Sequence, residues 1–252
     1  MHALALRHLW VAITLGLTAI SPVWAGCDDA PGPGVNWTAC DKEGIDLRGE
    51  DLRGAIFSRT NLAGAKLTKA RMDNADFQLA NLSEADLSRA RLYQARFVGA
   101  NRTKANFSNA RIREGRFDRA NGEGARFNDA SLAKATFYGS SLAEADFSGA
   151  RIDQASFEEA DLYIALLAGA QGESANFSSA VLEEADLTGA SLPRTQFQNT
   201  RMLGAILTDA DLTRANLVGA ELTDARLTGT ILDNASWINR RRCRPGSIGE
   251  CR

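Results

Sequence analysis

The chain from Ala75 to Gly99 reads ADFQL ANLSE ADLSR ARLYQ ARFVG, so each group of five opens with alanine and carries a large apolar residue in third place. The same register continues without insertion from Leu47 to Trp237, where 39 positions lie five residues apart. All but three of these positions hold Leu, Phe, Ile, Met or Trp. The three exceptions are Arg102, Gly122 and Gly172.

The residue two positions before each large one is equally regular. Of the 37 such positions from Ala55 to Ala235, 31 are alanine and the others are glycine, serine or threonine. A period of five matches neither the 3.6 residues of a helix nor the 2.0 of a flat strand. The pattern therefore predicts a short extended run and a corner in every unit, with one large and one small side chain turned inward.

The phenylalanines indicate how many units make one turn. One row recurs every 20 residues, and a second row with the same spacing lies ten residues out of phase. This spacing predicts four five-residue units per coil, with the two rows on opposite walls. Rings stacked at one strand spacing gain energy beyond their buried area. The first row is Phe57, Phe77, Phe97, Phe117, Phe137, Phe157, Phe177 and Phe197, and the second is Phe107, Phe127 and Phe147.

The repeated Ala-(Asp/Asn)-(Leu/Phe)-x-x units resemble the pentapeptide-repeat family, whose fold is an all-β, right-handed quadrilateral β-helix. The resemblance covers residues 45–239 of the 252-residue chain. It implies a solenoid of just under ten coils, roughly 47 Å long at about 4.8 Å per coil. The cysteine-containing flanks resemble those of an exported subgroup of the family.

Residues 1–25 have the pattern of a cleaved export signal. Arg7 precedes an apolar stretch at residues 9–20, and small residues follow before Gly26. That stretch is shorter than the roughly 20 residues that cross a bilayer. We expect a mature chain that begins at Gly26 and is periplasmic or secreted. Because Ala25-Gly26-Cys27 also resembles the end of a lipoprotein box, the alternative is a protein anchored to a membrane through lipid on Cys27.

The four cysteines cluster at the two ends of the chain, in an N-terminal cap (residues 26–44) and a C-terminal cap (residues 240–252). Caps of this kind protect the strand edges at the ends of a solenoid. A disulfide requires Cα atoms within about 7 Å, which excludes pairing across the length of a rod. We therefore predict the local disulfides Cys27–Cys40 and Cys243–Cys251, which an oxidising compartment permits.

No catalytic residue, cofactor site or metal site is expected. Both histidines lie in residues 1–25, so the mature chain lacks the commonest general base and metal ligand. An enzyme that uses the carboxylates Glu158, Glu159 and Asp161 is an alternative. Some cytoplasmic family members imitate DNA and protect DNA gyrase, but export and mixed charge disfavour that function here. The leading interpretation is a non-catalytic scaffold or binding rod of the cell envelope, with an unknown partner and no nucleic acid.

Two outward groups are candidate interaction sites. A row of arginines with 20-residue spacing, interrupted by Ser131, is either an anion-binding strip or solvated surface. A small apolar group is a candidate partner site, although isolated surface apolar residues need no explanation. The arginine row is Arg71, Arg91, Arg111 and Arg151, and the apolar group is Tyr163, Ile164, Leu166 and Val181.

Three further features depart from plain repeats. Arg102 replaces a core leucine, and it either marks a polar pocket or uses the room left by Gly122 while its guanidinium reaches solvent or pairs with Glu123. Gly172 is expected to mark a local bend. A row of asparagines with 20-residue spacing predicts a structural amide ladder. The row is Asn61, Asn81, Asn101 and Asn121.

Charge is distributed unevenly along the chain. Residues 89–126, the basic belt, hold ten basic and three acidic residues, a net charge of +7. Residues 127–190, the acidic belt, hold eleven acidic and two basic residues, a net charge of −9. The two belts predict weak, salt-sensitive self-association or binding to a charged envelope partner.

Overall fold

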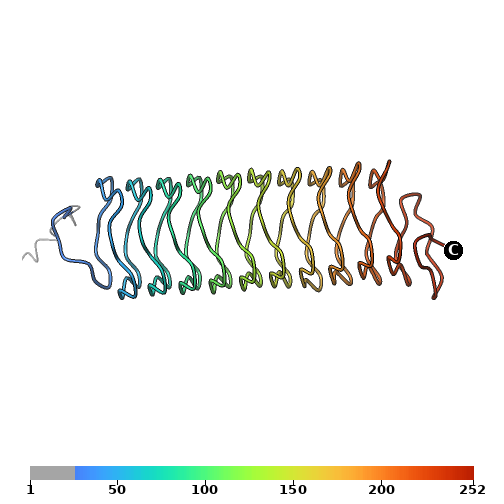
Figure 1. Ribbon diagram of the computed structural model, residues 1–252, viewed down its shortest axis with the longest axis horizontal. Helices are drawn as coiled ribbons and strands as arrows, with labels where there is room; N and C mark the ends of the chain where they lie inside the picture. Colours follow the sequence, from blue (N-terminus) through green and yellow to red (C-terminus); the bar gives the residue numbers. More distant parts are fainter. Residues whose placement is uncertain (1–25) are drawn as a thin grey trace, which may run out of the picture.

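The structure is a computed structural model that describes residues 26–252, so the expected export signal lies outside the described residues. The chain winds into a long rod of stacked coils (Figure 1). Residues 26–252 contain no helix and no continuous strand. Single parallel β-bridges instead join residues 20 positions apart, from Asn36 with Ile56 to Asn216 with Ser236. A spacing of 20 residues corresponds to four five-residue units.

The bridges form four columns along the rod. The column from Asp51 to Ile231 holds the predicted arginine row, and we call this the arginine side. The column from Asp41 to Glu221 holds the asparagine row, and we call this the asparagine side. These two sides are opposite because they lie two units apart in a turn of four. The remaining two columns begin at Asn36 and Asp46.

Each five-residue unit contains one bridged residue, one inward large residue, a turn and one inward small residue. In one such turn the N–H of Ala75 donates to the carbonyl of Met72 at 3.1 Å. Asn74 within it has a φ of 60°, as the third position of a type II turn requires. The left-handed conformation is unfavourable for residues other than glycine. Pairing between coils, such as the Phe77 N–H to Arg96 carbonyl bond of 2.7 Å, holds the backbone in place.

The core confirms the predicted stacking of phenylalanines. Each ring of the first row from Phe57 to Phe177 stacks on the ring 20 residues further along, up to Phe197 at the end of the row, with the closest centroids 4.7 Å apart. The second row meets the first edge to face across the core, as Phe107 does with Phe117 at 5.9 Å. The alanine row lies inside the rod, as predicted.

The hydroxyl residues that interrupt the alanine row have a shared role that the sequence did not reveal. Each is buried and donates to a main-chain carbonyl 23 residues earlier, at 2.6–3.1 Å. A buried hydroxyl without such a partner would be costly. The five residues are Thr60, Ser140, Thr195, Thr200 and Thr230.

Gly172 does not interrupt the pairing between coils. The parallel bridges continue through the neighbouring Gln171 on both sides. Ile152 and Leu192 occupy the space that a side chain would take, because a Cβ at Gly172 would lie 2.5 Å from Ile152 and 3.2 Å from Leu192. Repacking by neighbours therefore accommodates this glycine.

The N-terminal end joins the coil pattern earlier than residue 45. Bridges begin at Asn36, and buried Trp37 places its ring 5.7 Å from Phe57, so it extends the first phenylalanine row. At the other end the chain folds back, and Ile248 and Arg242 form antiparallel bridges with the last coil. No helix in residues 26–252 is long and apolar enough to cross a membrane.

Both end segments hold the local disulfides expected from the sequence. Cys27 and Cys40 are joined with their Cα atoms 5.5 Å apart. Cys243 and Cys251 are joined with their Cα atoms 4.8 Å apart. Each disulfide lies beyond or at the edge of the bridge columns and ties down a segment that covers one end of the rod.

Candidate anion-binding site

The predicted arginine row forms a continuous line on the arginine side. Parallel bridges connect Arg71 to Arg91, Arg91 to Arg111, Arg111 to Ser131 and Ser131 to Arg151. The four steps span roughly 19 Å at about 4.8 Å per step. The side chains of Arg91, Arg111 and Arg151 are exposed, whereas Ser131 is half-buried. The row is therefore a line of cations with one small residue inside it.

A shallow hollow of about 570 Å³ lies over this part of the row. We call it the Arg111 hollow. Because Ser131 is short, the longer side chains around it rise above its position. Four arginines line the hollow together with one aspartate, one serine and one tyrosine. The lining residues are Asp73, Arg91, Tyr93, Arg111, Arg113, Ser131 and Arg151.

Three of these four arginines form an ion pair with a carboxylate. The Arg91–Asp73 pair is 3.3 Å apart, Arg113–Glu114 is 3.5 Å and Arg151–Asp153 is 3.6 Å. Within residues 26–252, no ion pair involves Arg111. Exposed pairs of this kind contribute only about 0–1 kcal/mol. Arg111 is therefore the one arginine lining the hollow whose charge no ion pair offsets within the described residues.

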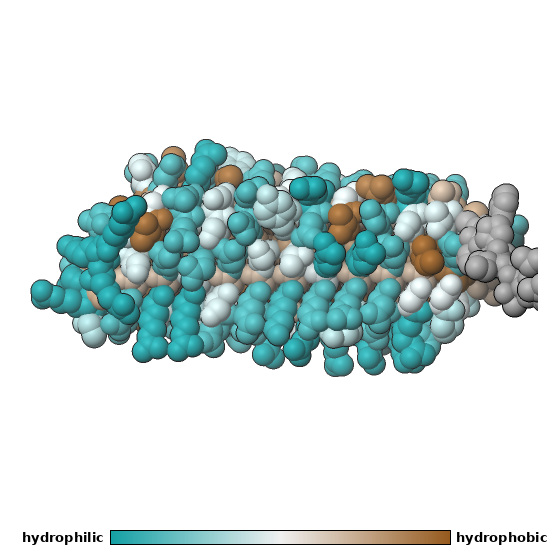
Figure 2. All heavy atoms as spheres, turned by 180° about the vertical axis from the view of Figure 1, so that it is seen from behind, coloured by the Kyte–Doolittle hydropathy of each residue, from teal (hydrophilic) through white to brown (hydrophobic). Residues whose placement is uncertain are grey.

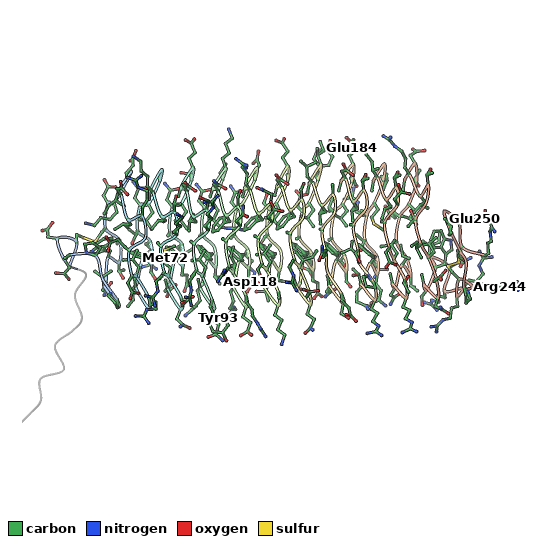
Figure 3. All side chains as sticks on the ribbon, turned by 60° about the horizontal axis from the view of Figure 1, so that its bottom comes forward. Met72, Tyr93, Asp118, Glu184, Arg244 and Glu250 are labelled. Atoms are coloured by element: carbon green, nitrogen blue, oxygen red, sulfur yellow. A yellow bond between two sulfur atoms is a disulfide. The ribbon has the colours of Figure 1, made fainter. Side chains whose placement is uncertain are left out.

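Tyr93 was not singled out from the sequence, yet it is the aromatic wall of the hollow. Its side chain is 41 % exposed, and Figure 3 shows it at the outer edge of the rod while Met72 lies inside. Its hydroxyl donates to Glu114 at 3.3 Å. That bond and a stronger one from Gln94 lower the pKa of Glu114. Tyr93 and Arg113 could have been found from their spacing, since both stand two residues after a row position.

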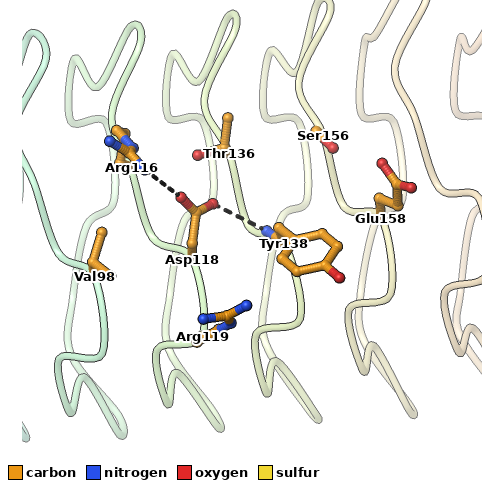
Figure 4. Close-up of a pocket in the computed structure, with 8 residues that line it drawn as sticks. All are labelled: Val98, Arg116, Asp118, Arg119, Thr136, Tyr138, Ser156 and Glu158. Carbon is orange, nitrogen blue, oxygen red and sulfur yellow. Dashed lines mark hydrogen bonds and ion pairs between the residues drawn. The ribbon is translucent and has the colours of Figure 1, made fainter.

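A second hollow, of about 480 Å³, lies around Tyr138 on the column that begins at Asn36 (Figure 4). Its four charged side chains balance in number, with Arg116 and Arg119 against Asp118 and Glu158. Asp118 pairs with Arg116 at 3.2 Å and accepts the Tyr138 N–H at 3.3 Å. The hydrogen bond between Tyr138 and Glu159 raises the pKa of the phenol. This hollow therefore offers less free charge to a ligand than the Arg111 hollow.

The three carboxylates considered for catalysis do not converge. Glu158 lines the Tyr138 hollow and accepts from Asn176 at 3.2 Å. Asp161 is on the asparagine side and accepts the N–H of Tyr163 at 3.1 Å. Glu159 occupies the corner between them, with a φ of 58°. In the described part of the chain, no group of three or more His, Cys, Asp or Glu side chains is placed to hold a metal ion.

The predicted apolar group lies around one corner of the rod. Tyr163, Ile164 and Leu166 are 40 %, 37 % and 42 % exposed, and Val181 is half-buried. Ile164 has a φ of 55°, which is unfavourable for a β-branched residue. On the face shown in Figure 2, apolar residues are scattered between ranks of hydrophilic side chains. Nothing in the described structure identifies what would cover the group.

Arg102 corrects one expectation and supports another. Gly122 does leave room, because a Cβ there would lie 3.1 Å from Nη2 of Arg102. The guanidinium, however, neither reaches solvent nor pairs with Glu123: it is fully buried, and none of its nitrogens has a hydrogen-bond partner. It lies over the rings of Phe117 at 4.6 Å and Phe127 at 5.7 Å. Burial lowers the pKa of Arg102 to about 9.

The asparagine row forms the expected ladder over part of its length. The amide of Asn81 donates to Asn61 at 3.1 Å, and that of Asn101 donates to Asn81 at 3.2 Å. Asn61 in turn donates to Asp41 at 2.9 Å. Asn121 continues the bridge column and accepts the N–H of Glu123 at 3.2 Å. These amides are engaged with one another, which fits a structural role.

A rod of five-residue units with four columns of parallel bridges defines a β-solenoid. The family model for the pentapeptide repeat region matches residues 70–147. The model for pentapeptide repeats, in eight copies, matches residues 43–83, 140–171, 173–209 and 205–236. The chain belongs to the pentapeptide repeat family, whose members fold as right-handed quadrilateral β-helices.

Solved structures of the family resemble this chain at low identity. HetL, a pentapeptide repeat protein involved in heterocyst differentiation regulation from the cyanobacterium Nostoc sp. strain PCC 7120, is 27 % identical with a TM-score of 0.43, covering 79 % of this chain and 92 % of its own. QnrB1, a plasmid-mediated fluoroquinolone resistance protein, is 20 % identical with a TM-score of 0.37, covering 77 % and 94 %. No functional conclusion follows from these TM-scores. No curated protein matches the chain.

Proposed function

We propose that this chain is an exported, non-catalytic solenoid that acts as a binding or scaffold module in the cell envelope. Its contact surface for an anionic partner is the Arg111 hollow. The observation that carries this proposal is the group of four arginines in the hollow, of which Arg91, Arg113 and Arg151 form ion pairs and Arg111 forms none in the described structure. We also propose that the solenoid of this chain is right-handed and has just under ten coils. In this proposal the rod is the rigid support, and the arginines of the hollow bind the anionic partner.

Export to the periplasm or the medium is supported by the signal pattern of residues 1–25 and by the two disulfides, since disulfides persist in oxidising compartments. Cell fractionation and mass spectrometry of the recovered protein test this part. We expect an N-terminus at Gly26 and both disulfides intact. A diacylglycerol adduct on Cys27, with Cys40 free, would instead establish the lipoprotein alternative.

Retention on an immobilised sulfonate surface tests the hollow. One variant replaces Arg91, Arg111 and Arg151 by glutamine. A control variant with the same change in net charge replaces three exposed arginines outside the hollow. We expect the first variant to elute at clearly lower salt than the control, and equal elution would contradict the proposal. The control residues are Arg59, Arg126 and Arg226.

Protection of DNA gyrase by DNA mimicry is not proposed. A mimic of duplex DNA needs a continuously acidic surface, whereas this rod carries a basic belt of net charge +7 over residues 89–126. Crosslinked recovery of partners from the envelope fraction, with the three-arginine variant as the comparison, would identify the natural partner. A partner captured equally by both forms would lie elsewhere on the rod.

A further inference from the structure

We propose that the Arg111 hollow binds a linear acidic polysaccharide, a polymer of carboxylate-bearing sugars that lies along the rod axis. This inference rests on the proposed function, because it names the class of the anionic partner. Three features of the hollow carry it: the arginines form a line, the floor is made by a small residue, and one exposed aromatic ring stands at the wall.

The line of arginines favours a polymer over a small anion. A single phosphate or carboxylate is bound best by donors that converge on one point. Here Arg91 and Arg111 lie one coil apart, about 4.8 Å, and Arg111 and Arg151 lie two coils apart, about 9.6 Å. They therefore meet charges that repeat along an extended chain. The spacing between coils is close to the length of one sugar unit.

The position of Ser131 favours a ligand with bulk between its charges. The residue breaks the arginine row and leaves the hollow between Arg111 and Arg151. Ala133, two residues later, is also small, so this floor carries no long side chain. A sugar ring fits over a serine hydroxyl that can donate to or accept from a ring substituent. Arg111, which lacks an acidic partner in the described structure, then faces the carboxylate.

Tyr93 favours a polysaccharide over a bare polyanion. Sugars present C–H faces that pack on aromatic rings, and the exposed Tyr93 ring offers such a surface beside Arg91 and Arg113. A polyphosphate chain has no apolar face and gains nothing from this ring. A single-stranded nucleic acid would need a series of aromatic platforms, about one per base. Among the residues that line the hollow, Tyr93 is the only aromatic one.

Titration calorimetry with defined probes tests the inference on the mature protein with its disulfides intact. The ligand is a hexamer of galacturonic acid, and the matched uncharged probe is the same hexamer fully methyl-esterified. A polyphosphate of similar length and charge is the third probe. We expect the acidic hexamer to bind, the ester to bind at least about tenfold more weakly, and binding to fall as salt rises.

Point variants separate the site from general charge. Arg111→Gln should weaken binding of the acidic hexamer about tenfold, whereas Arg226→Gln, exposed on another side, should leave it unchanged. Tyr93→Ala should weaken the hexamer severalfold and leave polyphosphate unaffected, and Tyr93→Phe should retain binding. Unchanged thermal unfolding of each variant would show that the fold is intact, as expected for exposed positions.

The outcomes distinguish this inference from the proposed function. If polyphosphate binds as well as the hexamer and Tyr93→Ala changes neither, the polysaccharide is wrong and the anionic partner stands. If the hexamer binds but Arg111→Gln has no effect, this hollow is not the binding site. If no probe binds and the three-arginine variant also elutes with its control from the sulfonate surface, both the inference and the proposed function fail.

Discussion

Two inner walls of the rod use the same backbone but pack in different ways. The wall of the first phenylalanine row holds one ring per coil, and each ring meets its neighbours face to face, as Phe97 meets Phe117 at 4.7 Å. The wall of Arg102 holds leucine above and below, but an arginine and a glycine in between. The Arg102 side chain reaches into the coil of Gly122 and fills the place of its missing side chain.

The two walls differ little in the side-chain volume that they bury, but they differ in the cost of removing a charge from water. An arginine and a glycine together bring one side-chain heavy atom fewer than two leucines, so volume is nearly conserved when it is shared between coils. The cost of burying the charge of Arg102 is not reduced by sharing volume between coils. The guanidinium of Arg102 has lost water and found no hydrogen-bond partner, and only the faces of Phe117 and Phe127 compensate it. Such cation–π contacts contribute about 0.5–2 kcal/mol.

Removing a ring from the regular wall should have the largest effect. Phe117→Ala leaves a cavity between the stacked rings of Phe97 and Phe137 and removes the ring beneath Arg102. We expect the free energy of unfolding to fall by about 3–5 kcal/mol in urea denaturation. Phe197→Ala is the control, because Phe197 ends the row and stacks only on Phe177, at 5.3 Å. Equal losses at the two positions would contradict a role for stacking on both faces.

Restoring leucine at both irregular positions of the Arg102 wall should raise the free energy of unfolding. The double variant Arg102→Leu with Gly122→Leu restores one leucine per coil and removes the buried charge. Replacing buried charged groups by well-packed apolar residues often stabilises a protein by about 1–4 kcal/mol. We expect a gain in that range, measured by urea denaturation. A double variant less stable than the natural chain would show that the rings compensate Arg102 fully.

The two single variants show whether these positions act together. Gly122→Leu alone places a side chain where the guanidinium lies, so it should destabilise the rod by about 1–3 kcal/mol. Arg102→Leu alone removes the charge but leaves the space at Gly122 unfilled. The effects should therefore be non-additive, as expected for residues in contact. Additive effects would mean that Arg102 does not occupy the coil of Gly122 in solution.

The change in the free energy of unfolding with pH that is due to Arg102 should be smaller than the effects of these substitutions. Burial lowers the pKa of Arg102 to about 9 from the much higher ordinary value of an arginine. Between these values the unfolded chain binds more protons than the folded one, so the free energy of unfolding rises with pH. Below pH 9 both states keep the proton and the contribution is constant. Relative to Arg102→Leu, the natural chain should gain at most about 1.4 kcal/mol between pH 9 and 10. Parallel urea-denaturation results for the two proteins at pH 7, 9 and 10 would contradict this.

Much of the fold could be predicted because one short-range rule is repeated along the chain. The spacing of Phe97 and Phe117 is enough to indicate both the stacking and the number of units per turn. Thr60 was harder to interpret, since its partner is the carbonyl of Trp37, 23 residues earlier. The early start of the coil at Trp37 was hidden because alanine and leucine do not yet alternate regularly there.

The candidate site was predicted only in part. The 20-residue spacing makes the arginine row visible in the sequence, but it cannot show that Ser131 forms the floor of a hollow. The depth of the hollow depends on Tyr93 and Arg113, which belong to the turns and not to the row. The burial of Arg102 could not be predicted either, because a long side chain can turn toward solvent or into the next coil. The space at Gly122 and the rings of Phe117 and Phe127 decide which of the two directions the side chain takes.

The smallest expected effect concerns charge on the outside of the rod. The basic and acidic belts lie side by side along the chain, so two rods displaced lengthwise can set one belt against the other. Exposed pairs contribute only about 0–1 kcal/mol each, and salt screens them over about 8 Å at physiological ionic strength. We therefore expect weak self-association at low salt, measured by sedimentation, that fades as salt rises.

Arg102 gives this prediction its control, because it is counted among the ten basic residues of the belt but is buried among rings. Arg102→Leu should change the stability of the rod and leave its salt-dependent association unaltered. Arg111→Gln, which removes an exposed charge from the same belt, should weaken association with little change in stability. A monomer at every salt concentration, or an oligomer indifferent to salt, would exclude the belts as the cause. If both variants weaken association equally, the buried guanidinium of Arg102 contributes to the electrostatic potential at the surface of the rod. In that case a buried residue would affect both the stability of the rod and its association.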